Sequence, residues 1–556
     1  MTIKKRIVTA TVEVPAEILT PGPTGHRVAV IDYDASANAL YEPARIEVRG
    51  DGSVGEVLSA EYIENPASVP AKVYNAAILD DPRFHAQHVF AVIMRTLARF
   101  EFALGRRVPW GSDGHQLHVA PHAFAEANAY YSRSDRALMF GYFHNAKGQP
   151  VYSCLSHDVV AHETTHAILD GLRSRYVEPS SPDQAAFHEG FSDVVAILSV
   201  FALEEVVSAI LASDDVDGRL IADADLTREA LRTSSFFKIG ENMGTEASRV
   251  HGDALRHSIM LDPGRDYMAD PAFKEPHRRG ELLVAAMLNS FLDIWLQRIE
   301  PLGFVTRRMR DRSRVVEEGA KAASHLLTMA IRAIDYCPPT DITFADFTSA
   351  LLTVDAEVVP DDTRFGYREA LIRNFRQFGI RTSSNAQADG TWGSDAKHYT
   401  YSRTHFDSML RDKEEVFRFI WENRKELELG DHGYIEVQSV RPATRIGPDG
   451  FVLRETVAEY VQILTLTLSE LGAEWGIDPD IDLPDWYRLR IFGGGTLIFN
   501  EYGQVKFHIA NRLSHNPEAV KRQKARLESL FHAGYFDQRS DDSSPFAAMH
   551  RQRLIS

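Results

Sequence analysis

The chain has 556 residues, which is long enough for two or three domains. Its hydrophobic content of 44% and charged content of 25% are those of an ordinary soluble globular protein. The net charge of −17 argues against a nucleic-acid partner, which would require a basic face. The two cysteines, Cys154 and Cys337, form neither a disulfide framework nor a metal-binding spacing, so we expect two small buried side chains.

The N-terminal residues predict no targeting segment. The basic residues at positions 4–6 are not followed by the apolar stretch of a signal peptide. The chain has no run of about 18 apolar residues, which predicts that no segment spans a membrane. Together with the low cysteine content, this pattern predicts a cytoplasmic protein, or one exported by a route that the sequence does not reveal.

The first 80 residues are predicted to be rich in β-structure, with strand candidates at Val8–Val14 and His26–Tyr33. A long helix is predicted at 84–105, where it ends at a glycine. His85 and His88 lie three residues apart on this helix and could contact one ligand. Because no third ligand is near them in the sequence, we interpret both as packing or surface histidines.

Residues 116–143 are predicted to form strands, with a turn at Ser132–Asp135. An edge strand in this region could bind an extended peptide as an additional strand, because main-chain hydrogen bonds would hold the peptide in place. Ordinary sheet structure without a binding role is the alternative interpretation of these residues.

The strongest chemical signal is the pattern His-Glu-x-x-His formed by His162, Glu163 and His166. Residues four apart in a helix share a face, so the two histidines would present their imidazoles to one point. Two ligands of a zinc ion must converge on the metal in this way. Glu163 would reach a metal-bound water without being a ligand itself. The alternative is a core helix whose histidines only form hydrogen bonds.

A second segment supplies the missing third ligand. Glu189 follows His166 by 23 residues, within a stretch that reads as the start of another apolar helix. A catalytic zinc site has three protein ligands and leaves a fourth position for water. Asp193 lies four residues beyond Glu189 and would accept a hydrogen bond from a ligating imidazole, which fixes its tautomer. The alternative for Asp193 is a helix carboxylate with no such partner.

The pattern His-Glu-x-x-His followed by Glu-x-x-x-Asp resembles the signature of the thermolysin-like zinc metallopeptidases, or gluzincins. The stretch Asp158–Glu163 is similar to the family's entry into its zinc helix, and Asn128–Tyr131 with Ala137–Gly141 is similar to its substrate-binding edge strand. The resemblance covers residues 80–290, is weaker to 380 and is absent elsewhere. It implies an α+β, two-lobed fold with a β-rich N-terminal lobe, a helical C-terminal lobe and the zinc helix between them.

The resemblance also implies roles around the reacting carbonyl group. Tyr176 and His277 would stabilise the developing oxyanion, and Arg256 would bind a substrate carbonyl. Tyr176 lies ten residues past His166, one residue short of the family's usual spacing, so a packing aromatic is the alternative.

Two choices near His277 stay open. His251 and His257 are rival candidates for its role. Either Asp270 or Glu275 would orient the catalytic imidazole, and the sequence does not choose between these two carboxylates.

Further residues have supporting roles by resemblance. Asn128 and Ala129 would bind the substrate backbone, and Asp170 would lie behind the zinc ligands. The chain also departs from the family, because Val194–Leu203 is almost wholly apolar where the calcium sites need clustered acidic residues. One zinc ion is therefore expected, and calcium is not.

The composition changes near residue 384, where Ser383–Gly390 is typical of a linker. The rest is predicted to be a separate α+β module, with a strand bend at Gly493–Gly495. Its predicted helices are Lys413–Leu429 and Pro517–His532, and its predicted strands are Leu464–Leu468, Arg490–Phe492, Thr496–Asn500 and Val505–Ile509. The division we predict for the chain is 1–80 β-rich, 81–175 N-terminal peptidase lobe, 176–383 helical lobe, 384–537 module and 538–556 disordered tail.

The sequence thus predicts a zinc metalloendopeptidase that acts on a peptide or protein substrate, with Glu163 as the general base. The C-terminal module would restrain the enzyme or recruit its substrate. The alternative is a catalytically silent zinc-bearing binding or scaffold protein, against which the intact Glu163 counts. A processing enzyme with a single partner substrate is a third possibility that the sequence does not separate from the first.

Overall fold

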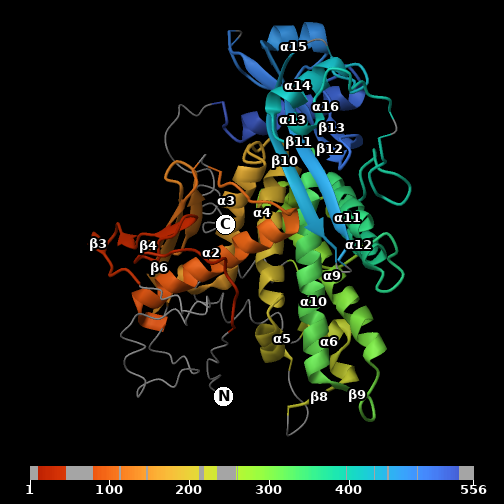
Figure 1. The fold of residues 1–556 in the computed structure, drawn as a ribbon. Helices are drawn as coiled ribbons and strands as arrows, with labels where there is room; N and C mark the ends of the chain where they lie inside the picture. The colour runs from red at the N-terminus through yellow and green to blue at the C-terminus, as the bar shows by residue number, and fades with distance from the viewer. Residues whose placement is uncertain are drawn as a thin grey trace.

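The computed structural model describes residues 10–44, 79–111, 114–145, 148–211, 218–233, 258, 261–395, 397–430, 433–447, 450–484 and 486–536. Within them the chain has mixed α and β structure (Figure 1). Of the predicted strand Val8–Val14, residues 10–14 are described and lie in no strand. The predicted tail at 538–556 lies outside the described residues.

The N-terminal lobe is built on a five-stranded sheet with the order β1-β4-β6-β5, in which β7 pairs with the far end of β6. Strands β1, β4 and β6 run parallel, with β1 at one edge of the sheet, and β5 runs antiparallel to β6 at the other edge. The strands of this lobe are β1 (Val28–Val30), β2 (Tyr33–Asp34), β3 (Ala39–Leu40), β4 (Leu117–Phe124), β5 (Ala129–Ser132), β6 (Ala137–His144) and β7 (Pro150–Tyr152).

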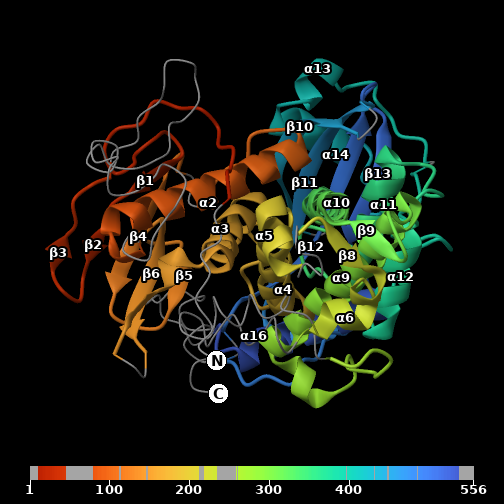
Figure 2. The same cartoon turned by 90° about the horizontal axis from the view of Figure 1, so that it is seen from below.

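Helix α2 (Pro82–Leu104) connects this lobe with the rest of the molecule, and its sequence prediction is confirmed. The Asp81 carboxylate caps its first turn by accepting a hydrogen bond from the Arg83 amide. Gly105 ends the helix in the left-handed conformation, with φ of 66°, which glycine adopts without steric cost. Figure 2 shows α2 extending from the N-terminal sheet to the start of the C-terminal sheet, with other helices between the two.

The middle of the molecule is helical, and a single large apolar core runs through it and into the N-terminal sheet. Its long helices are α3 (His157–Leu172), α4 (Pro182–Phe201), α9 (Pro276–Ile299), α10 (Arg312–Ala333), α11 (Phe344–Val358) and α12 (Tyr367–Gln377). Shorter elements join them, namely α5 (Glu204–Ile210), β8 (Leu220–Ala222), α6 (Arg228–Thr233) and β9 (Met309–Asp311).

Helices α4 and α9 bear on what the sequence predicted. The apolar helix predicted around Glu189 is α4, which begins at Pro182 because the Ser181 hydroxyl accepts from the Gln184 amide and proline fits the first turn. Among the described residues, the segment Pro276–Leu302 is the one helix whose length and composition would suit a membrane, and 83% of its most apolar stretch is buried. This helix, α9, packs against α4, α10 and α12, so it is apolar because it lies in the core of the molecule.

The C-terminal module contains a four-stranded antiparallel sheet in the order of the chain, β10-β11-β12-β13. Its elements are α13 (Phe406–Met409), α14 (Lys413–Glu422), β10 (Tyr434–Ile446), β11 (Val452–Leu466), α15 (Leu468–Trp475), β12 (Leu489–Asn500), β13 (Val505–Asn511) and α16 (Pro517–His532). The prediction of α16 is confirmed. The helix predicted to reach Leu429 ends at Glu422. The strand predicted at 464–468 overlaps the end of the 15-residue strand β11, which stops at Leu466, and Leu468 already begins α15.

The three glycines of β12 do not form the strand bend that we predicted. Gly493–Gly495 pair in continuous register with β11. Their small size permits close contact instead, since a Cβ on Gly494 would lie 2.4 Å from the carbonyl oxygen of Tyr460.

The segment predicted to be a linker and the residues directly after it pack against the preceding helices, and the Ser383 amide donates to the hydroxyl of Ser349 at 2.9 Å. Trp392 is buried, and its indole nitrogen donates to the carbonyl oxygen of Tyr336 at 2.9 Å. The side chains of Ile498, Phe507 and Ile509 from the C-terminal sheet belong to the same apolar core as α3 and α4. These side chains extend the core of the preceding helices into the module, which also has two smaller apolar clusters of its own.

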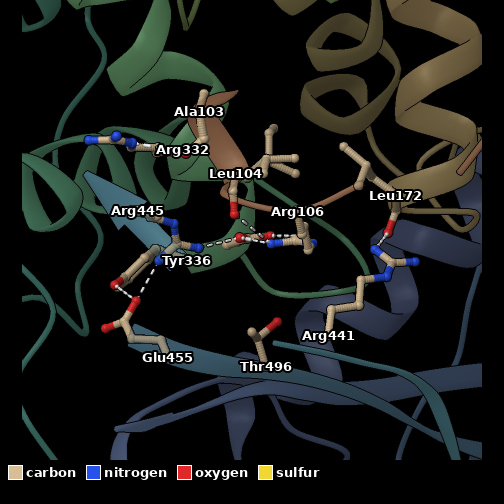
Figure 3. A network of polar contacts seen from close by, with 12 residues as sticks. Ala103, Leu104, Arg106, Leu172, Arg332, Tyr336, Arg441, Arg445, Glu455 and Thr496 are labelled. Carbon is tan, nitrogen blue, oxygen red and sulfur yellow. Dashed lines mark hydrogen bonds and ion pairs between the residues drawn. The ribbon is translucent and has the colours of Figure 1, made fainter. Parts of the chain in front are cut away.

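Buried ion pairs strengthen this attachment (Figure 3). Arg445 on β10 pairs with Glu455 on β11 and with Asp335, which follows α10, and Arg106 binds the same Asp335 carboxylate with two contacts of 2.6 Å. Burial by itself would raise the pKa of Asp335, but the two guanidinium groups hold it well below its usual range. The hydroxyl of Tyr336 donates to Glu455 at 2.7 Å.

A second set of contacts joins the module to the end of α3. Arg173, which caps that helix, pairs with Glu459 of β11 at 2.9 Å. Arg441 of β10 donates to the carbonyl oxygens of Gly171 and Leu172, both at 3.2 Å. The C-terminal sheet thus holds the last turn of α3 in position.

Candidate metal centre

Helix α3 presents two buried histidines to one point. The Nε2 atoms of His162 and His166 lie 2.9 Å apart, and the ring planes are close to perpendicular. Both side chains are almost completely excluded from solvent. The four-residue spacing within a regular helix produces this geometry, as the sequence predicted.

Helix α4 brings Glu189 to the same point. Its carboxylate oxygens lie 3.5 Å from Nε2 of His162 and 3.6 Å from Nε2 of His166. The three potential ligand atoms all lie within 4.8 Å of one another. Two imidazole nitrogens and one carboxylate oxygen that converge in this way could hold a metal ion.

Asp193 fixes the orientation of the first imidazole. Its Oδ1 lies 2.8 Å from Nδ1 of His162, so Nδ1 carries the proton and donates it to the carboxylate. The lone pair of Nε2 then points toward His166 and Glu189. This is the contact predicted for Asp193, and it prepares His162 for a metal ion on the opposite side of the ring.

The charges around His162 favour a cation. Burial lowers the pKa of this imidazole, but the carboxylates of Asp193, Glu189 and Glu163 outweigh that effect and raise it to about 10. Glu163 is fully buried beside His162, although it points one step further around the helix. A positive ion between the ligand atoms would satisfy the same negative charges.

His166 has supporting contacts that the sequence analysis did not predict. Its Nδ1 lies 2.7 Å from Nδ1 of His188 and 3.2 Å from Oγ of Ser192, both on α4. We missed these two residues. The available signal was their position, because His188 adjoins Glu189 and Ser192 lies one helical turn beyond it.

The described contacts of Asp170 are with the edge strand β5 and the turn after it. Its carboxylate accepts from the hydroxyl of Tyr131 at 2.9 Å and pairs with Arg133 at 3.2 Å. These contacts fasten α3 to β5 and to the turn after it. The role predicted for Asp170 behind the ligands stays a prediction.

Close packing of α4 against α9 brings His277 near the centre. The helices meet at Gly190 and Gly280, where a Cβ on Gly190 would lie 2.9 Å from the carbonyl oxygen of Gly280. Because the backbones approach so closely, Nε2 of His277 reaches to 3.8 Å from Oε2 of Glu189. His277 stands in the first turn of α9, next to the residue that caps it.

The orienting carboxylate for His277 is Glu275. Its Oε1 lies 2.7 Å from Nδ1 of His277, and the same carboxylate accepts from the backbone amides of His277 and Arg278. Burial raises the pKa of Glu275, but its hydrogen bonds to His277 lower it by more. Asp270 instead caps a 3-10 turn (Pro271–Lys274) and pairs with Arg265 at 2.6 Å.

Two other predicted catalytic residues are not brought to the centre by the described contacts. Tyr176 is buried in the core, where its hydroxyl donates to the carbonyl oxygen of Pro338 at 2.7 Å and its ring packs on Phe187. The structure supports the packing role that the sequence left as an alternative. Arg256 lies outside the described residues, as do the rival histidines at 251 and 257.

The predicted substrate strand is β5, which lies at the edge of its sheet and packs against α3. Asn128 is buried just before it. Its side-chain oxygen accepts from the Ala129 amide at 2.9 Å, and its carbonyl oxygen accepts from the Gly141 amide at 2.8 Å. Asn128 therefore shapes the start of the edge strand.

Comparisons with known proteins add no evidence about this site. The chain matches no protein-family model, and a search of curated protein sequences found no match to it.

Proposed function

We propose that this chain is a zinc metallopeptidase with a thermolysin-like arrangement of its two lobes. The observation that carries the proposal is the convergence of His162, His166 and Glu189 in a buried site that also contains Glu163. The resemblance of their sequence pattern to the gluzincin signature supports the same assignment. The substrate would be a peptide or protein, bound along the edge strand β5.

The donor set is appropriate for zinc. Two imidazoles and one carboxylate are a common ligand set of catalytic zinc sites, and a fourth position stays open for water. Calcium and magnesium prefer oxygen ligands, which makes them poor occupants of a site with two histidines. When bound, zinc would supply a water of lowered pKa and polarise the scissile carbonyl group.

The protein side chains would move the protons. Glu163 would accept a proton as the nucleophile attacks and would return it to the leaving amine. Glu275 holds Nδ1 of His277, so the Nε2 edge of that ring faces Glu189 and the metal-binding point. A proton on Nε2 could be donated there to the developing oxyanion. Tyr176 is omitted from this mechanism because its hydroxyl is bonded to Pro338.

The C-terminal module contacts α3 at Gly171–Arg173, at least five residues beyond His166. At 1.5 Å per residue this is about 7.5 Å along the helix. We propose that the module positions α3, while a restraining or recruiting role stays a prediction. Removal of the chain after residue 384 would expose the buried pairs of Arg173 and Asp335, so point substitutions in the full chain are the better test.

The decisive experiment is digestion of an unfolded protein substrate by the wild type and by Glu163→Gln, each loaded with zinc. Loss of a general base should lower kcat/KM by about 10²–10⁴-fold. The metal content and the melting temperature of both proteins should be equal. Equal digestion by both would contradict the role of Glu163, and digestion by neither would favour a silent zinc-bearing scaffold or an enzyme with one partner substrate.

A further inference from the structure

A second group of metal-binding side chains lies in the N-terminal lobe. It consists of His85 from α2, His122 from β4 and Cys154 from the 3-10 turn Ser153–Leu155. All three are buried, and their potential ligand atoms lie within 4.8 Å of one another. None of them belongs to the centre formed by α3 and α4.

The outer nitrogens of both imidazoles face atoms that accept hydrogen bonds. Nε2 of His85 lies 2.7 Å from the carbonyl oxygen of Leu79. Nδ1 of His122 lies 2.9 Å from both carboxylate oxygens of Asp32. Each of these nitrogens therefore carries the proton of its ring, because a carbonyl or carboxylate oxygen can only accept.

The inner nitrogens then face each other with their lone pairs. Nδ1 of His85 lies 2.7 Å from Nε2 of His122, and two lone pairs at this distance repel unless a cation lies between them. A shared proton would need only these two atoms, whereas the sulfur of Cys154 converges on the same place as a third donor. Three convergent donors are the arrangement that a metal ion requires.

The outer contacts match the usual surroundings of metal-bound histidine. Ligating imidazoles generally donate their second N–H to a carboxylate or a backbone carbonyl, and His122 and His85 have one of each. His162 shows the same arrangement at the first centre, where Asp193 holds its Nδ1. The rings of His85 and His122 also pack against Tyr152, which gives the cluster an aromatic wall.

We propose that His85, His122 and Cys154 bind a second zinc ion. Two imidazoles and a thiolate are ligands that zinc accepts, whereas calcium and magnesium would require oxygen. Cys154 would lose its proton as the ion binds, and the resulting thiolate and the nearby Asp32 carboxylate would then balance the charge of a divalent ion. The proposal does not depend on the peptidase activity of the other centre.

This ion would have a structural effect. It would tie together α2, β4 and the turn that leads into α3, while Asp32 adds the segment after β1. Cys154 precedes the first residue of α3, His157, by three positions. The second ion would therefore fix the start of the helix that carries His162 and His166.

Cobalt substitution provides a selective test in the full chain. A cobalt ion with a thiolate ligand gives a sulfur-to-metal charge-transfer band in the near ultraviolet, and the ligands of the first centre contain no sulfur. We expect this band in the wild type and in Glu163→Gln, and its loss in Cys154→Ala. Cys337→Ala is the matched control, because that buried thiol donates to the Ala333 carbonyl and should leave the band unchanged.

Metal analysis of the purified zinc-loaded protein completes the test. The wild type should contain two zinc ions per chain, and Cys154→Ala and His122→Gln should each contain one. If both variants fail to fold, the spectrum and the zinc content of the wild type still decide the matter. A wild type with no charge-transfer band, with one zinc ion, or with copper in place of the second zinc would overturn the proposal.

Discussion

The two buried histidine pairs are alike in their inner geometry and different in what surrounds them. In each pair the facing nitrogens are less than 3 Å apart, and a carboxylate holds the outer side of one ring. Glu163 lies beside His162, and Nε2 of His277 lies 3.8 Å from Oε2 of Glu189; in the mechanism that we propose, both would exchange protons with a substrate. Beside His122 stand the rings of Tyr41 and Tyr152. The difference is consistent with the two roles that we propose, a reaction at the first centre and stability of the fold at the second.

The strongest test of this comparison removes one ligand from each centre. Glu189→Ala should abolish digestion of an unfolded protein, by more than the about 10²–10⁴-fold expected for loss of a general base. Cys154→Ala should lower the melting temperature but leave digestion intact at temperatures where the chain is folded. Each variant should lose one zinc ion per chain. If Cys154→Ala lost activity while still folded, the separation of roles would be wrong.

A second test disturbs the contact between α4 and α9. Gly190→Ala would place a Cβ 2.9 Å from the Gly280 carbonyl oxygen, so the helices must separate, at a cost of about 1–3 kcal/mol. His277 would then move away from Glu189, and digestion should weaken. Urea unfolding measures the stability change.

Gly472→Ala is the matched control for that substitution. Gly472 lies within α15, where an added Cβ meets no described atom within 4 Å. Because alanine favours a helix more than glycine does, this variant should be more stable by up to about 1 kcal/mol. If both variants behaved alike, the close crossing of α4 and α9 would have no energetic importance.

A third test compares the supporting carboxylates. Asp193→Asn and Asp32→Asn each weaken the partner of a histidine Nδ1. Loss of such a partner typically costs about 10–100-fold in metal affinity. Competition with a chelator should show that each substitution weakens one zinc ion and leaves the other unchanged. Weakening of both ions by one substitution would argue that the two sites are coupled.

The smallest effect is expected at His277. Glu275→Gln replaces a charged hydrogen bond to Nδ1 with a neutral one, which should lower kcat about tenfold without changing the zinc content. Asp270→Asn is the control, because Asp270 pairs with Arg265 and caps a different turn. An equal loss of kcat in both variants would point to a general disturbance of this segment.

The local parts of this arrangement could be predicted from sequence. His162 and His166 are one helical turn apart, so a single helix brings them together whatever surrounds it. Helix α2 was recognisable from its periodicity and its final glycine. The C-terminal helix α16 follows the same rule, since Asn516 and Pro517 mark its start.

The non-local parts could not be predicted. His85, His122 and Cys154 come from three separate elements, and only the pairing of the N-terminal strands and the packing of α2 join them. We therefore interpreted His85 as a packing residue, whereas the structure places it among three potential ligands. The packing role of Tyr176 was equally hard to predict, because the carbonyl group that its hydroxyl contacts belongs to Pro338, 162 residues further along the chain.

The ion pairs around Asp335 also determine how the molecule comes apart. Separation of the C-terminal sheet from the helices would break the Arg445–Asp335 and Arg173–Glu459 ion pairs and the hydrogen bond from Tyr336 to Glu455. The shared apolar core would be opened at the same time. Detachment of the module should therefore coincide with global unfolding, so the chain should melt in one cooperative transition and should show no stable intermediate in which only the module has unfolded.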